Sequence, residues 1–104
     1  MSKRLAFLEQ TTASGSKDPF AWYGLALEYR SLQRLVDALR TFETLKAMAP
    51  DYVPMYLMAG NLLETMGRKN EARNWYEAGK VAARIKGDAH ALSELESAIQ
   101  AAVA

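Results

Sequence analysis

Apolar residues recur along most of the chain at spacings of three and four residues, and not at the spacing of two that strands require. This period predicts amphipathic helices throughout, so the expected fold class is all-α. The first strong start signal is Asp18-Pro19, because an Asp side chain accepts hydrogen bonds from free helix N–H groups and Pro has no N–H to leave unsatisfied. We therefore expect a helix from about Pro19 to Leu32.

Further start and stop signals divide the remaining chain into helices. Pro50, Gly67 and Gly87 each follow an apolar stripe and end a helix there. Asn70 and Asp88 have side chains suited to capping a helix start. We expect these helices over residues 35–49, 53–66, 70–86 and 88–103, preceded by a short helix over about 2–10 and a flexible link over 11–17.

The chain also repeats itself at a period of 34 residues. Shifting the sequence by this distance superimposes Trp22 on Tyr56, Ala26 on Gly60, Ala38 on Ala72, Phe42 on Tyr76 and Glu43 on Glu77. This order of residues resembles the tetratricopeptide repeat, whose pattern is W-x2-L-G-x2-Y followed by Ala, an aromatic residue and Pro. The first copy supplies Trp22, Leu25, Ala26, Tyr29, Ala38, Phe42 and Pro50, and the second supplies Tyr56, Ala59, Gly60, Leu63, Ala72 and Tyr76.

The resemblance implies a right-handed α-solenoid of antiparallel helix hairpins with about five main helices. It divides the chain into an N-terminal helix and link (1–17), a first repeat (18–52), a second repeat (53–86) and a C-terminal capping helix (87–104). Arrays of this kind generally need about three repeats, because each repeat leaves an apolar face for its neighbour to cover. The last helix is expected to cover one end through Leu92, Leu95 and Ile99. The N-terminal helix either covers the other end through Leu5 and Leu8 or docks on a second subunit.

Small residues in this pattern predict close helix crossings. Ala26 is expected to face Ala38 within the first hairpin, and Gly60 to face Ala72 within the second. Larger residues such as Trp22 then fill the space beside each crossing. Three departures from the family pattern stand out, namely Gly24 inside a helix, Gly79 in place of Ala, and Arg84 in place of the closing Pro. Without that Pro, the helix is expected to continue to about Lys86.

Composition places the chain among ordinary soluble domains. It has 104 residues, of which 50% are hydrophobic and 24% charged, with a formal net charge of +1, and this length supports one modest core. Lysine and arginine alternate with acidic residues rather than forming a basic stripe, so no nucleic-acid partner is expected. The absence of cysteine excludes a disulfide framework, and the N-terminal apolar run at residues 5–8 is too short for a signal peptide or a membrane span. We expect a cytoplasmic protein with no membrane partner.

Residues that carry catalysis are scarce. His90 is the only histidine, and no Ser, Asp or Glu pair stands at a recognised nucleophile or metal-ligand spacing. The glycines occur singly, so no loop is suited to cradle a phosphate. We expect no enzyme activity, no cofactor and no metal site, and His90 is interpreted as a surface residue.

The resemblance implies a binding surface on the first helix of each repeat, which lines the concave side of such solenoids and holds a partner peptide or helix. The residues at these positions are Phe20, Tyr23, Leu27, Arg30, Leu57, Met58, Asn61 and Glu64. Asn61 matches one place of the family's carboxylate-binding variant, but Tyr23, Leu27 and Met58 occupy the others, so recognition of a C-terminal Asp is not predicted. Two alternatives stay open, in which the apolar stripe is covered by the chain's own N-terminal residues Leu5, Phe7 and Leu8, or forms a homo-oligomer interface.

Overall fold

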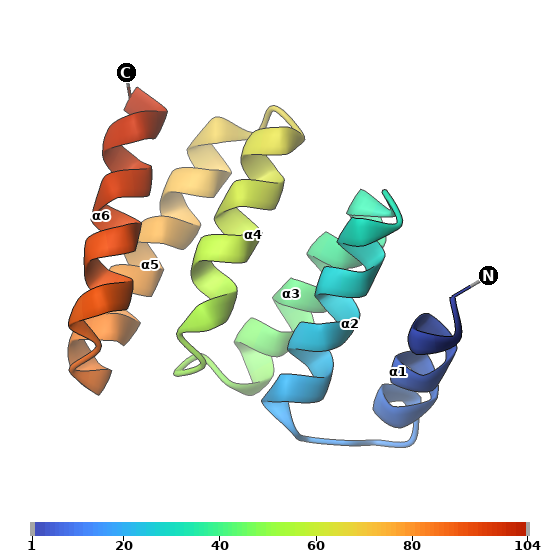
Figure 1. Cartoon of the computed structure of the whole chain (residues 1–104). Coiled ribbons are helices and arrows are strands. Elements are labelled where there is room, and N and C mark those ends of the chain that lie inside the picture. The colour runs from blue at the N-terminus through green and yellow to red at the C-terminus, as the bar shows by residue number, and fades with distance from the viewer. Residues whose placement is uncertain (1, 104) are drawn as a thin grey trace. The chain divides into compact units, whose positions relative to one another are not determined.

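The computed structural model describes residues 2–103, and these residues form six α-helices without a strand. The helices are α1 (Lys3–Ala13), α2 (Pro19–Ser31), α3 (Leu35–Met48), α4 (Pro54–Thr65), α5 (Lys69–Lys86) and α6 (Ala89–Val103) (Figure 1). The all-helical class is confirmed, and α5 does continue to Lys86 where the closing Pro is missing. The short N-terminal helix brings the total in this part of the chain to six.

The chain divides into two compact units, one before and one after the boundary between Ala49 and Pro50. In the first unit α2 packs against α3, and α1 packs against α2. In the second unit α4 packs against α5, while α6 lies mainly on α5 and also touches α4 (Figure 1). Each unit therefore consists of one repeat hairpin with one additional helix packed against it.

Most of the predicted helix ends are confirmed. The Asp18 carboxylate accepts a hydrogen bond from the Phe20 amide at 3.0 Å, and that of Asp88 accepts one from the Ala91 amide at 3.0 Å. Gly67 and Gly87 have left-handed φ angles of 75° and 69°, which a residue without a Cβ adopts at little cost.

The predicted cap at Asn70 is wrong. The helix begins at Lys69, its cap position is Arg68, and no side chain caps its free amides. A salt bridge of 2.7 Å between Arg68 and Glu71 spans the first turn instead. The cap position therefore lies two residues earlier than the polar Asn suggests.

The turn inside each hairpin repeats the same backbone geometry. Gln33 and Gly67, 34 residues apart, both have positive φ angles, of 63° and 75°. The next amide then closes the turn, from Arg34 to the Tyr29 carbonyl at 2.9 Å and from Arg68 to the Leu63 carbonyl at 2.8 Å. The 34-residue period is thus present in the main chain as well as in the side chains.

The N-terminal helix is longer than expected, and the predicted link is correspondingly shorter. α1 extends to Ala13, so the prediction of a flexible link from residue 11 is wrong for its first three residues. Thr12 is buried and its hydroxyl donates to the Leu8 carbonyl at 2.9 Å, which satisfies the polar group inside the helix. The Trp22 indole N–H donates to the Ser16 carbonyl at 2.8 Å and ties the remaining link to α2.

A close helix approach is observed at Gly60, where the nearest atoms belong to the Tyr76 ring. A Cβ placed on Gly60 would lie 2.6 Å from Cδ1 and 2.7 Å from Cζ of Tyr76, so this glycine makes room for an aromatic ring of α5. A Cβ on Gly79 would lie 2.5 Å from Cβ of Tyr56 and 3.1 Å from Cδ1 of Leu95. α4 and α6 therefore both approach α5 closely at Gly79, which explains why Gly stands there in place of Ala.

We expect Gly24→Ala to stabilise the protein. Gly24 lies inside α2, and a Cβ there would sit 3.5 Å from Cδ2 of Leu8, an ordinary van der Waals contact. Because alanine favours a helix interior over glycine, the free energy of unfolding should rise by about 0.5–1 kcal/mol. Urea unfolding followed by circular dichroism measures this change, and a lower unfolding midpoint would show that Leu8 packs too tightly to accept the methyl group.

Candidate protein-interaction surface

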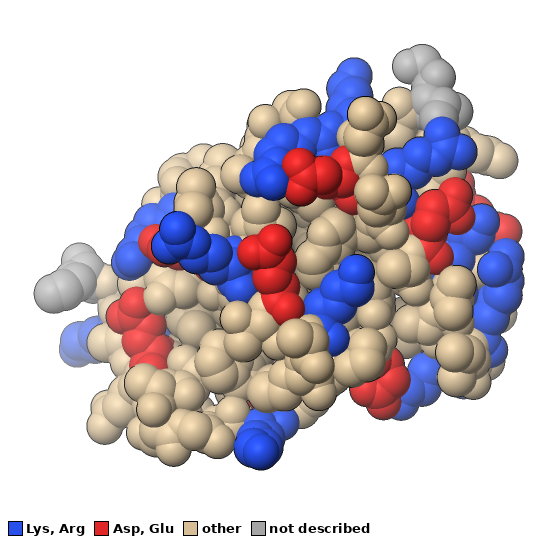
Figure 2. All heavy atoms as spheres, turned by 180° about the vertical axis from the view of Figure 1, so that it is seen from behind, with Lys and Arg blue, Asp and Glu red and all other residues tan. Residues whose placement is uncertain are grey.

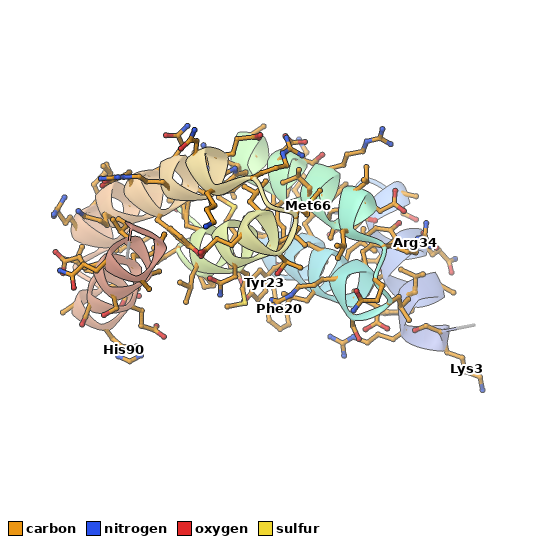
Figure 3. All side chains as sticks on the ribbon, turned by 90° about the horizontal axis from the view of Figure 1, so that it is seen from above. Lys3, Phe20, Tyr23, Arg34, Met66 and His90 are labelled. Carbon is orange, nitrogen blue, oxygen red and sulfur yellow. The ribbon has the colours of Figure 1, made fainter. Side chains whose placement is uncertain are left out.

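The first half of the predicted surface lies on one face of α2. Phe20 is 68% exposed, and Tyr23, Leu27 and Arg30 follow it at helical spacing with partly buried side chains. The Tyr23 ring packs edge-on against Phe42 of α3, with the ring centroids 6.5 Å apart. Figure 3 shows Phe20 projecting from the edge of α2 that is turned away from α3. This face combines a fixed aromatic ring with a protruding one.

The second half of the predicted surface lies on α4, and the structure divides it into two kinds of residue. Leu57 and Met58 are partly buried apolar side chains. Asn61 and Glu64 are instead bound from within the hairpin, because the Tyr76 hydroxyl contacts Oδ1 of Asn61 at 2.7 Å and donates a short hydrogen bond to the Glu64 carboxylate. These two polar side chains are therefore held in place by α5.

The bonding of Tyr76 is a site feature that the sequence pattern did not reveal. Burial, together with the hydrogen bond to Glu64 and the negative charge of that residue, raises the pKa of the Tyr76 phenol well above its ordinary value. The group therefore stays protonated and remains a donor. The available signal was the phenol itself, since Tyr76 stands where the first repeat has Phe42, and a buried tyrosine hydroxyl usually finds a partner.

α1 covers a different face of α2 from the one proposed for the partner. Leu5 and Leu8 form a buried cluster with Leu25, against which Trp22 and Tyr29 pack. Phe7 and Phe20 remain 67% and 68% exposed. The alternative in which the N-terminal segment covers the apolar stripe is therefore wrong for Phe20, because Leu5 and Leu8 pack on Leu25 instead.

Polar contacts fix α1 on that face. The Tyr29 hydroxyl donates to the Glu9 carboxylate at 2.6 Å, and burial, aided by this bond, raises the pKa of Tyr29 to about 12. Glu28 accepts a hydrogen bond from the Ser2 hydroxyl at 2.9 Å and lies 3.4 Å from the Arg4 guanidinium. The amphipathic stripe of α1 thus matches both the apolar and the charged residues of α2.

Side chains that could bind a metal ion do not gather in the part of the chain that the structure describes. No group of three or more His, Cys, Asp or Glu residues in residues 2–103 could hold a metal ion. The His90 side chain is 87% exposed, lies 3.3 Å from Glu94 and projects outward in Figure 3. Over the same residues, no helix combines the length and the apolar character that crossing a bilayer requires.

These features define an all-helical repeat protein. The sequence model of the tetratricopeptide repeat matches residues 53–79. A tetratricopeptide repeat domain protein from Salinibacter ruber, solved by NMR, is 39% identical over 82% of this chain and 86% of its own, with a TM-score of 0.79. A crystal structure of such a domain protein from the same organism is also 39% identical, over 82% of this chain and 94% of its own, with a TM-score of 0.77.

The chain belongs to the tetratricopeptide repeat family. A Bordetella parapertussis protein shares the fold over 99% of this chain and 90% of its own, with a TM-score of 0.83 and 23% identity. No curated protein matches the sequence. Members of the family generally serve in protein–protein interaction rather than in catalysis.

Proposed function

We propose that this protein is a non-catalytic scaffold that binds a peptide or helix of a partner protein through the exposed faces of α2 and α4. The observation that carries the proposal is the 68% exposure of Phe20 beside the partly buried Tyr23 and Leu27. Large aromatic side chains that protrude from an apolar face are typical anchors of protein interfaces. Leu57 and Met58 supply the corresponding apolar contacts on α4, and the flexible Met58 adapts to the shape of a guest.

The polar residues of the surface orient the partner. Arg30 lies at the end of the apolar stripe on α2, and Glu64 takes the corresponding place on α4. Because Tyr76 holds Asn61 and Glu64, these two groups lose little freedom when a partner arrives. They therefore add orientation at a small entropic cost, while the aromatic and aliphatic residues supply most of the affinity.

The test compares two equally exposed phenylalanines. Phe20→Asp places a charge on the proposed surface, and Phe7→Asp places one on α1, where the side chain is 67% exposed. Partners are first captured from the native cell with the unaltered chain, and their binding to purified variants is then measured by calorimetry. We expect Phe20→Asp to raise the dissociation constant at least about 30-fold, the effect of losing an interface anchor, and Phe7→Asp to leave it unchanged.

A double variant extends the test to both helices. Tyr23→Ala combined with Leu57→Ala should abolish binding while the helical circular dichroism signal stays close to that of the unaltered chain. Equal binding by Phe20→Asp and the unaltered chain would place the site elsewhere. Loss of self-association in the same variants would favour a homo-oligomer built through this surface.

A further inference from the structure

A second apolar surface lies on the outer side of α5. Ile85 is 79% exposed and Val81 is 55% exposed, and both belong to the same face as Ala78 and Ala82. The opposite side of α5 is occupied, since Gly79 meets α4 and α6. α5 lies behind α4 in Figure 1, so its outer side is turned toward the viewer in Figure 2, where charged residues of both signs surround uncharged ones. Adjacent exposed branched residues on a helix of this length mark a contact surface.

A preformed apolar cavity of about 280 Å³ lies beside this face, between α5 and the turn that precedes α4. Its walls include Pro50, Tyr56, Ala78 and Ile85. The Tyr56 hydroxyl donates a short hydrogen bond to the Pro50 carbonyl, and Lys86 of α5 lies 3.4 Å from Asp51 of the turn. These contacts hold the turn against the helix, so the cavity needs no rearrangement to accept an apolar side chain.

The sequence of α5 is complementary to itself in the antiparallel direction. Ala78 and Ile85 are seven residues apart, as are Glu77 and Arg84, and residues seven apart share one side of a helix. A two-fold axis at Val81 therefore brings Ile85 of each copy to within one residue, about 1.5 Å along the helix, of the level of Ala78 of the other. Glu77 of each copy likewise comes within one residue of the level of Arg84 of the other, on the same flank of the contact.

We infer that α5 is the interface of a homodimer in which two copies of this helix pack antiparallel about Val81. Ile85 of each copy enters the cavity beside Ala78 of the other copy. The large Ile85 thus packs against the small Ala78 on both sides of the two-fold axis. Two Glu77–Arg84 ion pairs flank this contact and set its direction. A parallel arrangement would instead leave Glu77 of one copy and Arg84 of the other about 10 Å apart along the helix, so these ion pairs could not form.

The existing ion pairs of Glu77 do not prevent this arrangement. Glu77 lies 3.3 Å from Lys80 and 3.9 Å from Arg73 on its own helix, and about half of the carboxylate-bearing side chain is exposed, at 47%. Such surface pairs are worth little, and the Glu77 carboxylate has further oxygen lone pairs for a second cation. An interface made of one helix face from each copy buries less than about 1,200 Å², which is small for a protein–protein interface. The dimer should therefore be weak and concentration-dependent.

The first experiment measures self-association of the full chain by sedimentation velocity over a concentration series up to about 1 mM. We expect the unaltered chain to shift from monomer to dimer. Val81→Asp should raise the dimer dissociation constant at least about tenfold, because two carboxylates meet at the axis. Val36→Asp is the matched control, since Val36 on α3 is 56% exposed, and it should leave the constant unchanged. A monomer throughout the series, or equal loss in both variants, overturns the inference.

The second experiment tests the antiparallel register with two charge reversals. Glu77→Arg leaves each copy with two cations on this flank, and Arg84→Glu leaves two anions, so each variant alone should be monomeric. A mixture of the two should form a heterodimer, because every cross-pair then joins Arg to Glu. Thermal unfolding verifies that both variants are folded. Failure of the mixture to associate more strongly than either variant alone overturns the register and the interface with it.

These experiments distinguish the dimer from the partner-binding proposal. Phe20→Asp on α2 should raise the dissociation constant for the partner at least about 30-fold without changing that of the dimer. Val81→Asp on α5 should weaken the dimer without changing partner binding. A dimer that is lost in Phe20→Asp and kept in Val81→Asp overturns the inference on α5 and places self-association on α2.

Discussion

Gly60→Ala should lower the free energy of unfolding by about 2–4 kcal/mol, whereas the same substitution at Gly24 raises it. The added methyl group would overlap the fully buried Tyr76 ring, whose Cδ1 and Cζ lie 2.6 Å and 2.7 Å from the new Cβ position. Overpacking of this kind costs about 1–3 kcal/mol, and displacing the ring also weakens a hydrogen bond to the charged Glu64, worth about 1.5–3 kcal/mol. The better helix propensity of alanine offsets only about 1 kcal/mol of this loss.

Urea unfolding of the two alanine variants provides the measurement. Gly24→Ala is the matched control, because the chemical change is identical and only the surroundings differ. A second variant, Gly60→Ala combined with Tyr76→Leu, should be destabilised by less than the sum of its single changes, since the ring that meets the methyl group is gone. If Gly60→Ala proves as stable as the unaltered chain, the contact with Tyr76 does not constrain the hairpin.

Removal of α6 should abolish cooperative folding of the second unit. Leu95 is 1% exposed and Ile99 is 9% exposed, and Leu95 reaches α5 at the position where Gly79 permits close approach. A chain ending at Gly87 leaves that face of α5 uncovered, and an isolated repeat face is unstable in water. We expect the 1–87 fragment to melt without a sharp transition or to aggregate, as measured by circular dichroism and size-exclusion chromatography.

A full-length variant separates the role of the Leu95 contact from the effect of shortening the chain. Leu95→Asp places a charge in the packed contact and should lower the free energy of unfolding by at least about 4 kcal/mol, from the lost apolar burial and the buried charge together. Ser93→Asp lies on the exposed side of the same helix and should change it by less than about 0.5 kcal/mol. A soluble 1–87 fragment with a sharp melting transition would show that α4 and α5 fold without a cover.

Local chemistry in the sequence was enough to locate most of the helices. Asp18-Pro19, Gly67 and Asp88 act through atoms within a few residues, so their effect does not depend on the rest of the fold. The prediction that Asn70 caps α5 was wrong, because the helix begins at Lys69 and no side chain caps it. Thr11 and Thr12 looked like a link, but both are helical, and the buried Thr12 side chain has its hydroxyl satisfied by the Leu8 carbonyl.

The candidate surface was only partly accessible to sequence reasoning. The position of Phe20 in the repeat predicted a surface residue, and it is the most exposed member of the set. The same reasoning could not show that Asn61 and Glu64 are bound by Tyr76, because those residues lie 15 and 12 positions away along the chain. Nor could it show which face of α2 would receive α1, since apolar residues occupy both faces.

The sequence by itself determined the helical class, the 34-residue period and the family, because these follow from the order and spacing of residues along one chain. Only the tertiary structure decided what each side chain meets. It assigned Gly60 to the Tyr76 ring, directed Leu5 and Leu8 to Leu25, and left Ile85 exposed on α5. The physical reason is that periodicity fixes the face of a helix on which a residue lies, whereas contact depends on how closely two helices approach, and that distance is set by all the side chains between them.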